Sequence, residues 1–155
     1  MAKDILIFSV AGRQYGIGVK ELQSIENYIP PTSVSNGPEL IPGMISMRDE
    51  IYPVIDLHCK FSMPKAEVTE ETKYLLINTN AGKAACMVDS VIEIYKSDQE
   101  QVKPFPSMLR TKGTEYADCI IQAHDKLVLV ISPENLFTDE EAKEVTSVIE
   151  ENIEE

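Results

Sequence analysis

Residues 43–57, which read GMISMRDEIYPVIDL, decide how the rest of the sequence is interpreted. Two β-prone runs, 44–47 and 51–55, flank a polar turn at 48–50. This pattern predicts a β-hairpin. Asp56 follows the second run, and its carboxylate can accept hydrogen bonds from the unpaired backbone N–H groups that begin a short helix. The segment therefore predicts a strand, a tight turn, a second strand and a capped helix in succession.

The same succession returns further along the chain. An offset of 76 residues aligns three features of this segment with later ones. The turn residue Asp49 aligns with Asp125, the helix-cap residue Asp56 with Ser132, and the aromatic residue Phe61 with Phe137. An offset of 70 aligns Gly12 with Gly82 and the apolar run 5–7 with 75–77. Strand patterns also match by chance, so repeat and coincidence both stay open. A true repeat predicts two small β lobes, and lobes this short hide their edges best as barrels.

The remaining sequence reads as short strands separated by turns. Further strands are predicted at 4–10, 14–19, 74–79, 83–88, 91–95, 118–123 and 126–131. Short helices are predicted at 57–61 and 133–137, the latter opened by a serine and a proline. We therefore expect one mainly β domain over residues 1–155, with five-stranded lobes at about 1–70 and 71–138.

The C-terminal segment 139–155 differs in composition from the rest. It holds eight acidic residues and only Lys143, and so carries −7 of the net −12. Its apolar residues recur at intervals of three, four and four, as Ala142, Val145, Ile149 and Ile153. This spacing predicts an amphipathic helix, and residues 138–141 form a capping box at its start. The helix either docks on the second lobe or binds a partner.

Composition excludes several classes of protein. The 155 residues include 14 Lys and Arg against 26 Asp and Glu, and this excess of negative charge disfavours nucleic acid and anionic membrane surfaces as partners. No apolar run exceeds five residues, whereas a membrane helix needs about 20. Met1–Asp4 leads directly into a strand, which predicts no signal peptide. The three cysteines, Cys59, Cys86 and Cys119, are odd in number and have no CxxC spacing, which argues against a disulfide framework and favours a reducing cytoplasm. Cys86 and Cys119 are expected in the core.

No catalytic or metal-binding motif stands out. Gly16 and Gly18 follow a strand, but Glu21 occupies the position of the third glycine in a dinucleotide-binding motif. The two histidines, His58 and His124, have no paired cysteine spacing around them that would favour zinc. We therefore expect a protein that is not an enzyme and that holds no metal or cofactor.

Segment 43–57 resembles the signature of the CheW-type chemotaxis coupling proteins, approximately G-V-I-N-L-R-G-x-[VI]-x-P-V-[IV]-[DN]-L. The matching positions are Gly43, Ile45, Arg48, Ile51, Pro53, Val54, Ile55, Asp56 and Leu57. Segments 8–17, 22–25 and 87–91 resemble other parts of the same family, so the resemblance runs from about 4 to 137. It implies two SH3-like five-stranded β-barrels.

The sequence departs from this family pattern at the turn. Ser46 and Asp49 stand where the pattern has Asn and Gly. Because glycine adopts positive φ more readily than aspartate, we expect a turn of different shape. Some members carry a Glu at the position of Ser24 that can pair with the turn arginine. Here Glu26 and Glu50 are the two candidate replacements.

The resemblance implies a noncatalytic adaptor that joins the cytoplasmic tips of chemoreceptors to the regulatory domain of the histidine kinase CheA. The receptor-binding positions that it implies are Leu6, Val19, Leu22, Ile25, Arg48 and Val91. The competing interpretation for the five apolar residues is that they pack in the core. For Arg48 it is that the side chain is solvated on the turn and contacts no partner. The three apolar residues between 19 and 25 step by three, which favours a helical turn or an irregular edge.

The sequence assigns no kinase-binding residues, and we expect a monomer when the protein is alone. Two other classes stay open. One is a freestanding relative of the CheV proteins that regulates or competes. The other uses the barrels to bind a ligand or to catalyse a reaction.

Overall fold

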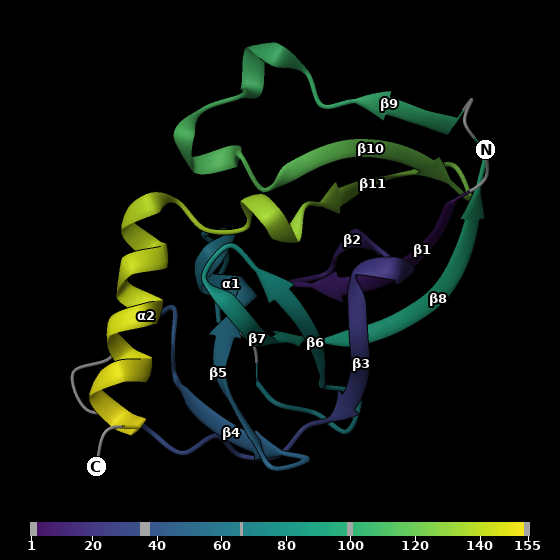
Figure 1. The fold of residues 1–155 in the computed structure, drawn as a ribbon. Helices are drawn as coiled ribbons and strands as arrows, with labels where there is room; N and C mark the ends of the chain where they lie inside the picture. Colours follow the sequence, from purple (N-terminus) through teal and green to yellow (C-terminus); the bar gives the residue numbers. More distant parts are fainter. Residues whose placement is uncertain (1–2, 35–37, 66, 99–100, 154–155) are drawn as a thin grey trace.

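The computed structural model describes residues 3–34, 38–65, 67–98 and 101–153, and its strands form two curled sheets (Figure 1). The first has six strands in the order β8-β1-β2-β11-β10-β9. Their bounds are β1 (Lys3–Val10), β2 (Arg13–Gly18), β8 (Ser90–Ser97), β9 (Val102–Pro104), β10 (Ala117–Ala123) and β11 (Lys126–Ile131). The second has five strands in the order β3-β6-β7-β5-β4. Their bounds are β3 (Leu22–Asn27), β4 (Gly43–Met47), β5 (Glu50–Asp56), β6 (Lys73–Thr79) and β7 (Gly82–Val88).

The two sheets are built to one plan. Each contains a hairpin whose second strand pairs in parallel with the second strand of another hairpin, β7 with β5 in one sheet and β2 with β11 in the other. Strands β3 and β8 take equivalent places beside β6 and β1. The prediction of a mainly β fold with two barrel-like lobes is confirmed, with the short β9 as an additional sixth strand.

The halves of the chain exchange their first hairpins. The hairpin β1–β2 lies in the sheet with β8 to β11, and β6–β7 lies in the sheet with β3 to β5. The sheets therefore do not coincide with the contiguous lobes 1–70 and 71–138 that we expected from the repeat. The physical reason is that the parallel pairs join strands from opposite halves of the chain.

Three hairpins turn through the same two-residue geometry. Both turn residues have positive φ in each, at 51° and 66° for Arg48 and Asp49 and at 51° and 64° for His124 and Asp125. Ala11 and Gly12 make the third such turn. Two-residue turns with two positive φ values match the right-handed twist of the flanking strands. Asp49 thus adopts the left-handed conformation that glycine would adopt without strain.

Helices close the core at the ends of the sheets. Helix α1 (Leu57–Lys60) follows β5, and the Asp56 carboxylate accepts a hydrogen bond of 2.9 Å from the N–H of His58, as predicted for a cap. A short 3-10 helix, η5 (Pro133–Asn135), follows β11 with its proline at the predicted first position. The Ser132 side chain makes no cap hydrogen bond to this helix, and its hydroxyl oxygen accepts from the side-chain amide of Asn135 at 3.3 Å.

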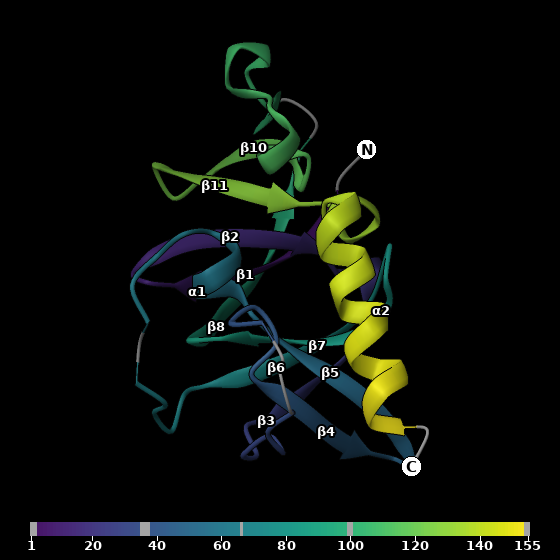
Figure 2. The same cartoon turned by 90° about the vertical axis from the view of Figure 1, so that its left-hand side faces the viewer.

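Helix α2 (Asp139–Ile153) docks on the main core, and Figure 2 shows it running from the level of β11 down to β4. Val145 and Val148 are buried, and Ala142 and Ile149 pack beside them. Glu141 and Thr138 form the predicted capping box. The buried ammonium of Lys60 also donates to Glu141 at 2.6 Å, which ties α2 to α1. Residues 154–155 of the predicted helix and the side chain of Ile153 lie outside the described residues.

The thiols differ in burial. Cys86 is 1% exposed in the main core, and burial raises its pKa to about 12. Cys119 is only half-buried, so the expectation of a core thiol is corrected at this position. The register of β10 shifts between Ala117 and Cys119, and β9 covers this side with only three residues. None of the described helices is both long and apolar enough to span a membrane.

Candidate functional site

Strand β3 carries most of the residues that the sequence singled out. Val19 begins a 3-10 turn, η1 (Val19–Glu21), and Leu22 is the first residue of β3. The pairing of β3 with β6 shifts register between Leu22 and Ser24, so β3 is a bulged strand at the edge of its sheet. The period of three in the sequence therefore has a structural cause, because a 3-10 turn leads directly into an irregular edge.

The apolar candidates divide into three levels of burial. Leu6 is 1% exposed and belongs to the main core, where a partner cannot touch it without rearrangement. Val19, Leu22 and Val91 are half-buried and pack against that same core. Ile25 is 40% exposed. The structure thus gathers one buried residue and three half-buried residues around one cluster, with Ile25 further out on β3.

Arg48 lies on the β4–β5 turn and reaches β3. Its guanidinium donates to the Glu26 carboxylate at 3.0 Å, and the Arg48 side chain remains 70% exposed. Of the two candidate partners, Glu26 therefore makes the ion pair. The hydroxyl of Ser24, which stands where some family members have Glu, is buried and has no hydrogen-bond partner among the described residues.

Glu50 is held elsewhere. Its carboxylate accepts from the Lys83 ammonium at 3.0 Å and from the Tyr52 hydroxyl at 2.8 Å. The hydrogen bond from Lys83 and, to a smaller extent, the one from Tyr52 lower the pKa of Glu50. The pKa of Tyr52 is raised, mainly by its hydrogen bond to Glu50 and secondly by burial. The same tyrosine accepts from Gln23 on β3 at 3.3 Å, so a side-chain hydrogen bond links β3 to β5 across the curled sheet.

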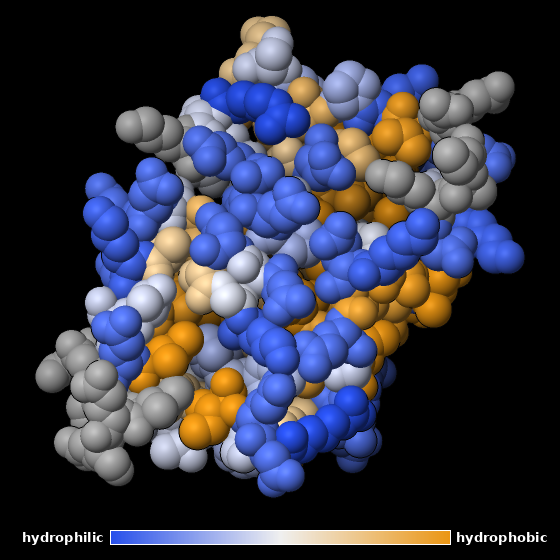
Figure 3. All heavy atoms as spheres, viewed as in Figure 1, coloured by the Kyte–Doolittle hydropathy of each residue, from blue (hydrophilic) through white to orange (hydrophobic). Residues whose placement is uncertain are grey.

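Two exposed isoleucines beside the predicted site were missed. Ile92 and Ile94 on β8 are 42% and 58% exposed, directly after Val91. Strand β8 is an edge strand, and Figure 3 shows apolar atoms gathered on its side of the molecule. The available signal was a run with apolar residues at both odd and even positions, which is unusual for an edge strand. We call Val19, Leu22, Ile25, Val91, Ile92 and Ile94 the apolar rim.

A further exposed apolar group lies apart on the segment between β9 and β10. Met108 and Leu109, on the 3-10 helix η3 (Ser107–Leu109), are 93% and 57% exposed. No strand or helix was predicted in this segment from the sequence. Within the described ranges, no cluster of three or more His, Cys, Asp or Glu side chains could hold a metal ion. The exposed apolar side chains and the Arg48 guanidinium can make apolar contacts and hydrogen bonds, which suits the binding of another macromolecule.

Comparison with known proteins shows which family this chain belongs to. The family model of the CheW-like domain matches residues 4–141. The chain belongs to the CheW family. The chemotaxis protein CheW of Klebsiella aerogenes is 28% identical over 96% of this chain and 89% of its own length. The chemotaxis protein CheW of Bacillus subtilis is 26% identical over 90% of this chain and 89% of its own length.

A solved CheW structure has the same fold. The crystal structure of the scaffolding protein TtCheW from Thermoanaerobacter tengcongensis aligns with a TM-score of 0.80 at 29% sequence identity. The alignment covers 88% of this chain and 93% of that one. The resemblance drawn from segment 43–57 is therefore confirmed at the level of family and fold.

Proposed function

We propose that this protein is a noncatalytic chemotaxis adaptor that couples the cytoplasmic tips of chemoreceptors to the regulatory domain of the histidine kinase CheA. The observation that carries the proposal is the CheW-like domain over nearly the whole chain, together with the partly exposed apolar rim on it. The adaptor acts in the cytoplasm and is a monomer when alone.

The receptor occupies the apolar rim in this proposal. The contacting residues are Val19, Leu22, Ile25 and Val91, and we extend the surface to Ile92 and Ile94 because they continue it along β8. Leu6 supports the surface from the core. A receptor tip presents a helix, and the apolar stripe of a helix docks into an apolar trough.

Arg48 supplies the polar part of the receptor contact. Its guanidinium uses one N–H donor on Glu26 and is otherwise largely exposed. A guanidinium has five donors in a planar fork, so the remaining ones can bond carboxylates or carbonyl oxygens of a receptor helix. Glu26 holds the arginine beside β3.

A reconstitution experiment tests the function. Binding of the pure protein to receptor-tip fragments and to the CheA regulatory domain is measured separately, and then kinase activity is measured with all three components. We expect both binding reactions and a rise in receptor-dependent kinase activity. Binding without activation, or with inhibition, favours the CheV-like regulatory alternative. Absence of both binding reactions contradicts the adaptor function.

A further inference from the structure

A cleft of about 460 Å³ lies between the first residues of β2 and the first residues of β11. These two strands pair in parallel through only two residue pairs, which begin at Tyr15 and Leu129. Figure 2 shows the strands converging from separate starting points towards their ends. The apolar lining of the cleft consists of Tyr15, Ile120, Leu127 and Leu129.

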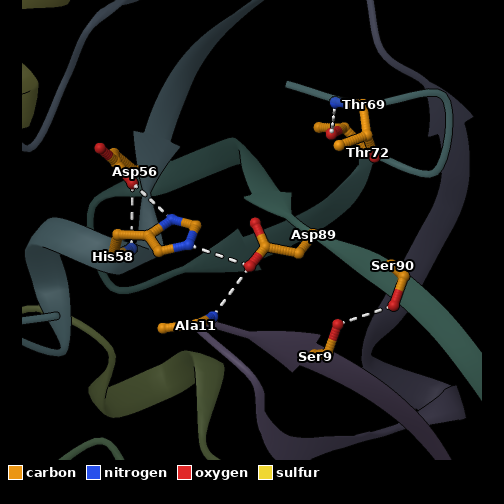
Figure 4. Close-up of polar contacts among 8 residues, drawn as sticks. All are labelled: Ser9, Ala11, Asp56, His58, Thr69, Thr72, Asp89 and Ser90. Atoms are coloured by element: carbon orange, nitrogen blue, oxygen red, sulfur yellow. Dashed lines mark hydrogen bonds and ion pairs between the residues drawn. The ribbon is translucent and has the colours of Figure 1, made fainter. Parts of the chain in front are cut away.

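Side chains join the corresponding parallel strands of the five-stranded sheet, β5 and β7. At their beginnings, the Glu50 carboxylate lies 3.0 Å from the Lys83 ammonium. Beyond their ends, the His58 ring of α1 lies with Nε2 3.0 Å from the carboxylate of Asp89, which follows β7 (Figure 4). The parallel pair in this sheet is therefore bridged at both ends.

The six-stranded sheet has other residues at the positions of the ion pair. Lys126 is the first residue of β11 as Glu50 is of β5, and Gln14 is the second residue of β2 as Lys83 is of β7. No hydrogen bond or ion pair joins Gln14 to Lys126 within the described ranges. An ammonium has no acceptor charge in an amide to match a carboxylate, so the cleft lacks the ion pair that bridges its counterpart.

Two cations flank the apolar lining, one on each strand. Arg13 on β2 and Lys126 on β11 both line the cleft and are exposed. Neither forms an ion pair with a described residue, although the chain has 26 acidic residues against 14 basic ones. Tyr15 is 6% exposed at the base of the cleft, whereas Leu127 is 70% exposed. The cleft thus combines an apolar lining with two positive charges that are free to bind an anion.

We propose that this cleft binds an acidic segment of a partner protein, in which a bulky apolar side chain lies beside aspartate or glutamate. The apolar side chain enters between β2 and β11, and the carboxylates pair with Arg13 and Lys126, whose charges they complement. The exposure of Leu127 makes the site an open one, which suits a side chain carried by a macromolecule better than an enclosed small molecule. The cleft is separate from the apolar rim on η1, β3 and β8, so the proposal does not depend on which protein occupies that rim.

NMR titration of the full chain with a capped peptide, Glu-Ser-Leu-Ser-Glu, tests the site. Alternate residues of an extended chain share a face, so its leucine lies between two carboxylates. Amide shift changes should centre on the residues that line the cleft. The peptides Gln-Ser-Leu-Ser-Gln and Glu-Ser-Ser-Ser-Glu should each bind at least about fivefold more weakly. Absence of binding, shift changes centred elsewhere, or equal affinity for the three peptides overturns the proposal.

A pair of double variants separates the cleft from general attraction of an acidic peptide to cations. Arg13→Gln with Lys126→Gln should weaken binding of the glutamate peptide at least about fivefold. The matched control is Lys96→Gln with Lys143→Gln, which removes two exposed cations from β8 and α2 and should leave Kd within about twofold. Added salt should weaken binding to the unmodified protein, a test that needs no variant. Equal weakening in the two double variants, or binding that salt does not change, overturns the proposal.

Discussion

The hairpins β4–β5 and β10–β11 share a backbone and differ in chemistry. Their turns have nearly the same φ values, and each turn reaches across its own sheet to the strand at the opposite side. Arg48 bonds Glu26 on β3 at 3.0 Å, and His124 lies 3.1 Å from Glu93 on β8. Turn geometry and its cross-sheet contact are thus repeated, with a permanent cation in one copy and a titratable ring in the other.

The strands that follow these turns differ as well. Asp56 caps α1 and contacts His58, whereas the Ser132 side chain does not cap η5. Gly43 begins β4 in close contact with a loop, whereas the equivalent Cys119 faces the short β9. The turns and the strand pairing are repeated and determine the fold. The side chains that are not repeated give each sheet its own surface and its own contacts at the strand ends. Four predictions test this division.

The largest effect is expected at Gly43. A Cβ at this position would press directly against the carbonyl oxygen of Thr32, whose backbone exchanges two hydrogen bonds with Met44. Gly43→Ala should lower the free energy of unfolding by about 3 kcal/mol, since the contact is with backbone that cannot move aside freely. The control is Cys119→Ala, which should lower it by less than about 1 kcal/mol. Equal losses in denaturant unfolding would remove this difference between the hairpins.

The next effect concerns the apolar rim on β3. Leu22→Glu should weaken binding of a receptor-tip fragment by about 2 kcal/mol, or about thirtyfold in Kd, because its charge would be desolvated against an apolar helix. Kinase binding should be unchanged. The matched control is Leu127→Glu on β11, where the wild-type leucine is already 70% exposed.

Thermal unfolding of Leu22→Glu distinguishes a surface from a core role. Folding near that of the wild type with receptor binding lost supports the rim. A large drop in Tm with both affinities reduced assigns Leu22 to the core. Normal folding with both affinities unchanged shows that the receptor binds elsewhere.

The sequence predicted local structure better than it predicted long-range arrangement. The turn predicted at 48–50, the Asp56 cap and the α2 capping box follow from residues a few positions apart. The structure has all three, with the turn confined to 48–49 and Glu50 already in β5. The exchange of hairpins between sheets could not be predicted in this way. It depends on parallel pairing of β5 with β7 and of β11 with β2, which alignment at offsets of 70 and 76 does not test.

The candidate site shows the same limit. Spacing alone left Glu26 and Glu50 as equal partners for Arg48, and the curl of the sheet decides between them by bringing β3 to the turn. Ile92 and Ile94 were read only as strand residues. Their exposure follows from the place of β8 at the sheet edge, which is a property of the assembled fold.

A smaller effect is expected at the helix caps. Asp56→Ala removes the side-chain acceptor for the His58 N–H and should lower the free energy of unfolding by about 1 kcal/mol. Ser132→Ala, at the equivalent position, should change it by less than about 0.5 kcal/mol, since no cap hydrogen bond is lost. Denaturant unfolding of both variants at one pH makes the comparison. A loss at Ser132 that matches the one at Asp56 would show that the two caps are equivalent after all.

The smallest effect concerns Glu50, whose equivalent in the second hairpin is Lys126. The hydrogen bond from Lys83, and then that from Tyr52, lowers the pKa of Glu50. A carboxylate with a lowered pKa stabilises the fold at neutral pH, and that contribution is lost as pH falls through the lowered pKa. Lys83→Met should therefore raise the Glu50 pKa, followed by carboxyl carbon NMR during acid titration, although the Tyr52 hydroxyl still holds it below its ordinary value. Lys126→Met should leave the Glu50 pKa unchanged, because Lys126 belongs to the other sheet. An unchanged Glu50 pKa in Lys83→Met would mean that water screens this exposed pair fully in solution, and the two hairpins would then be distinguished by their turns and caps alone.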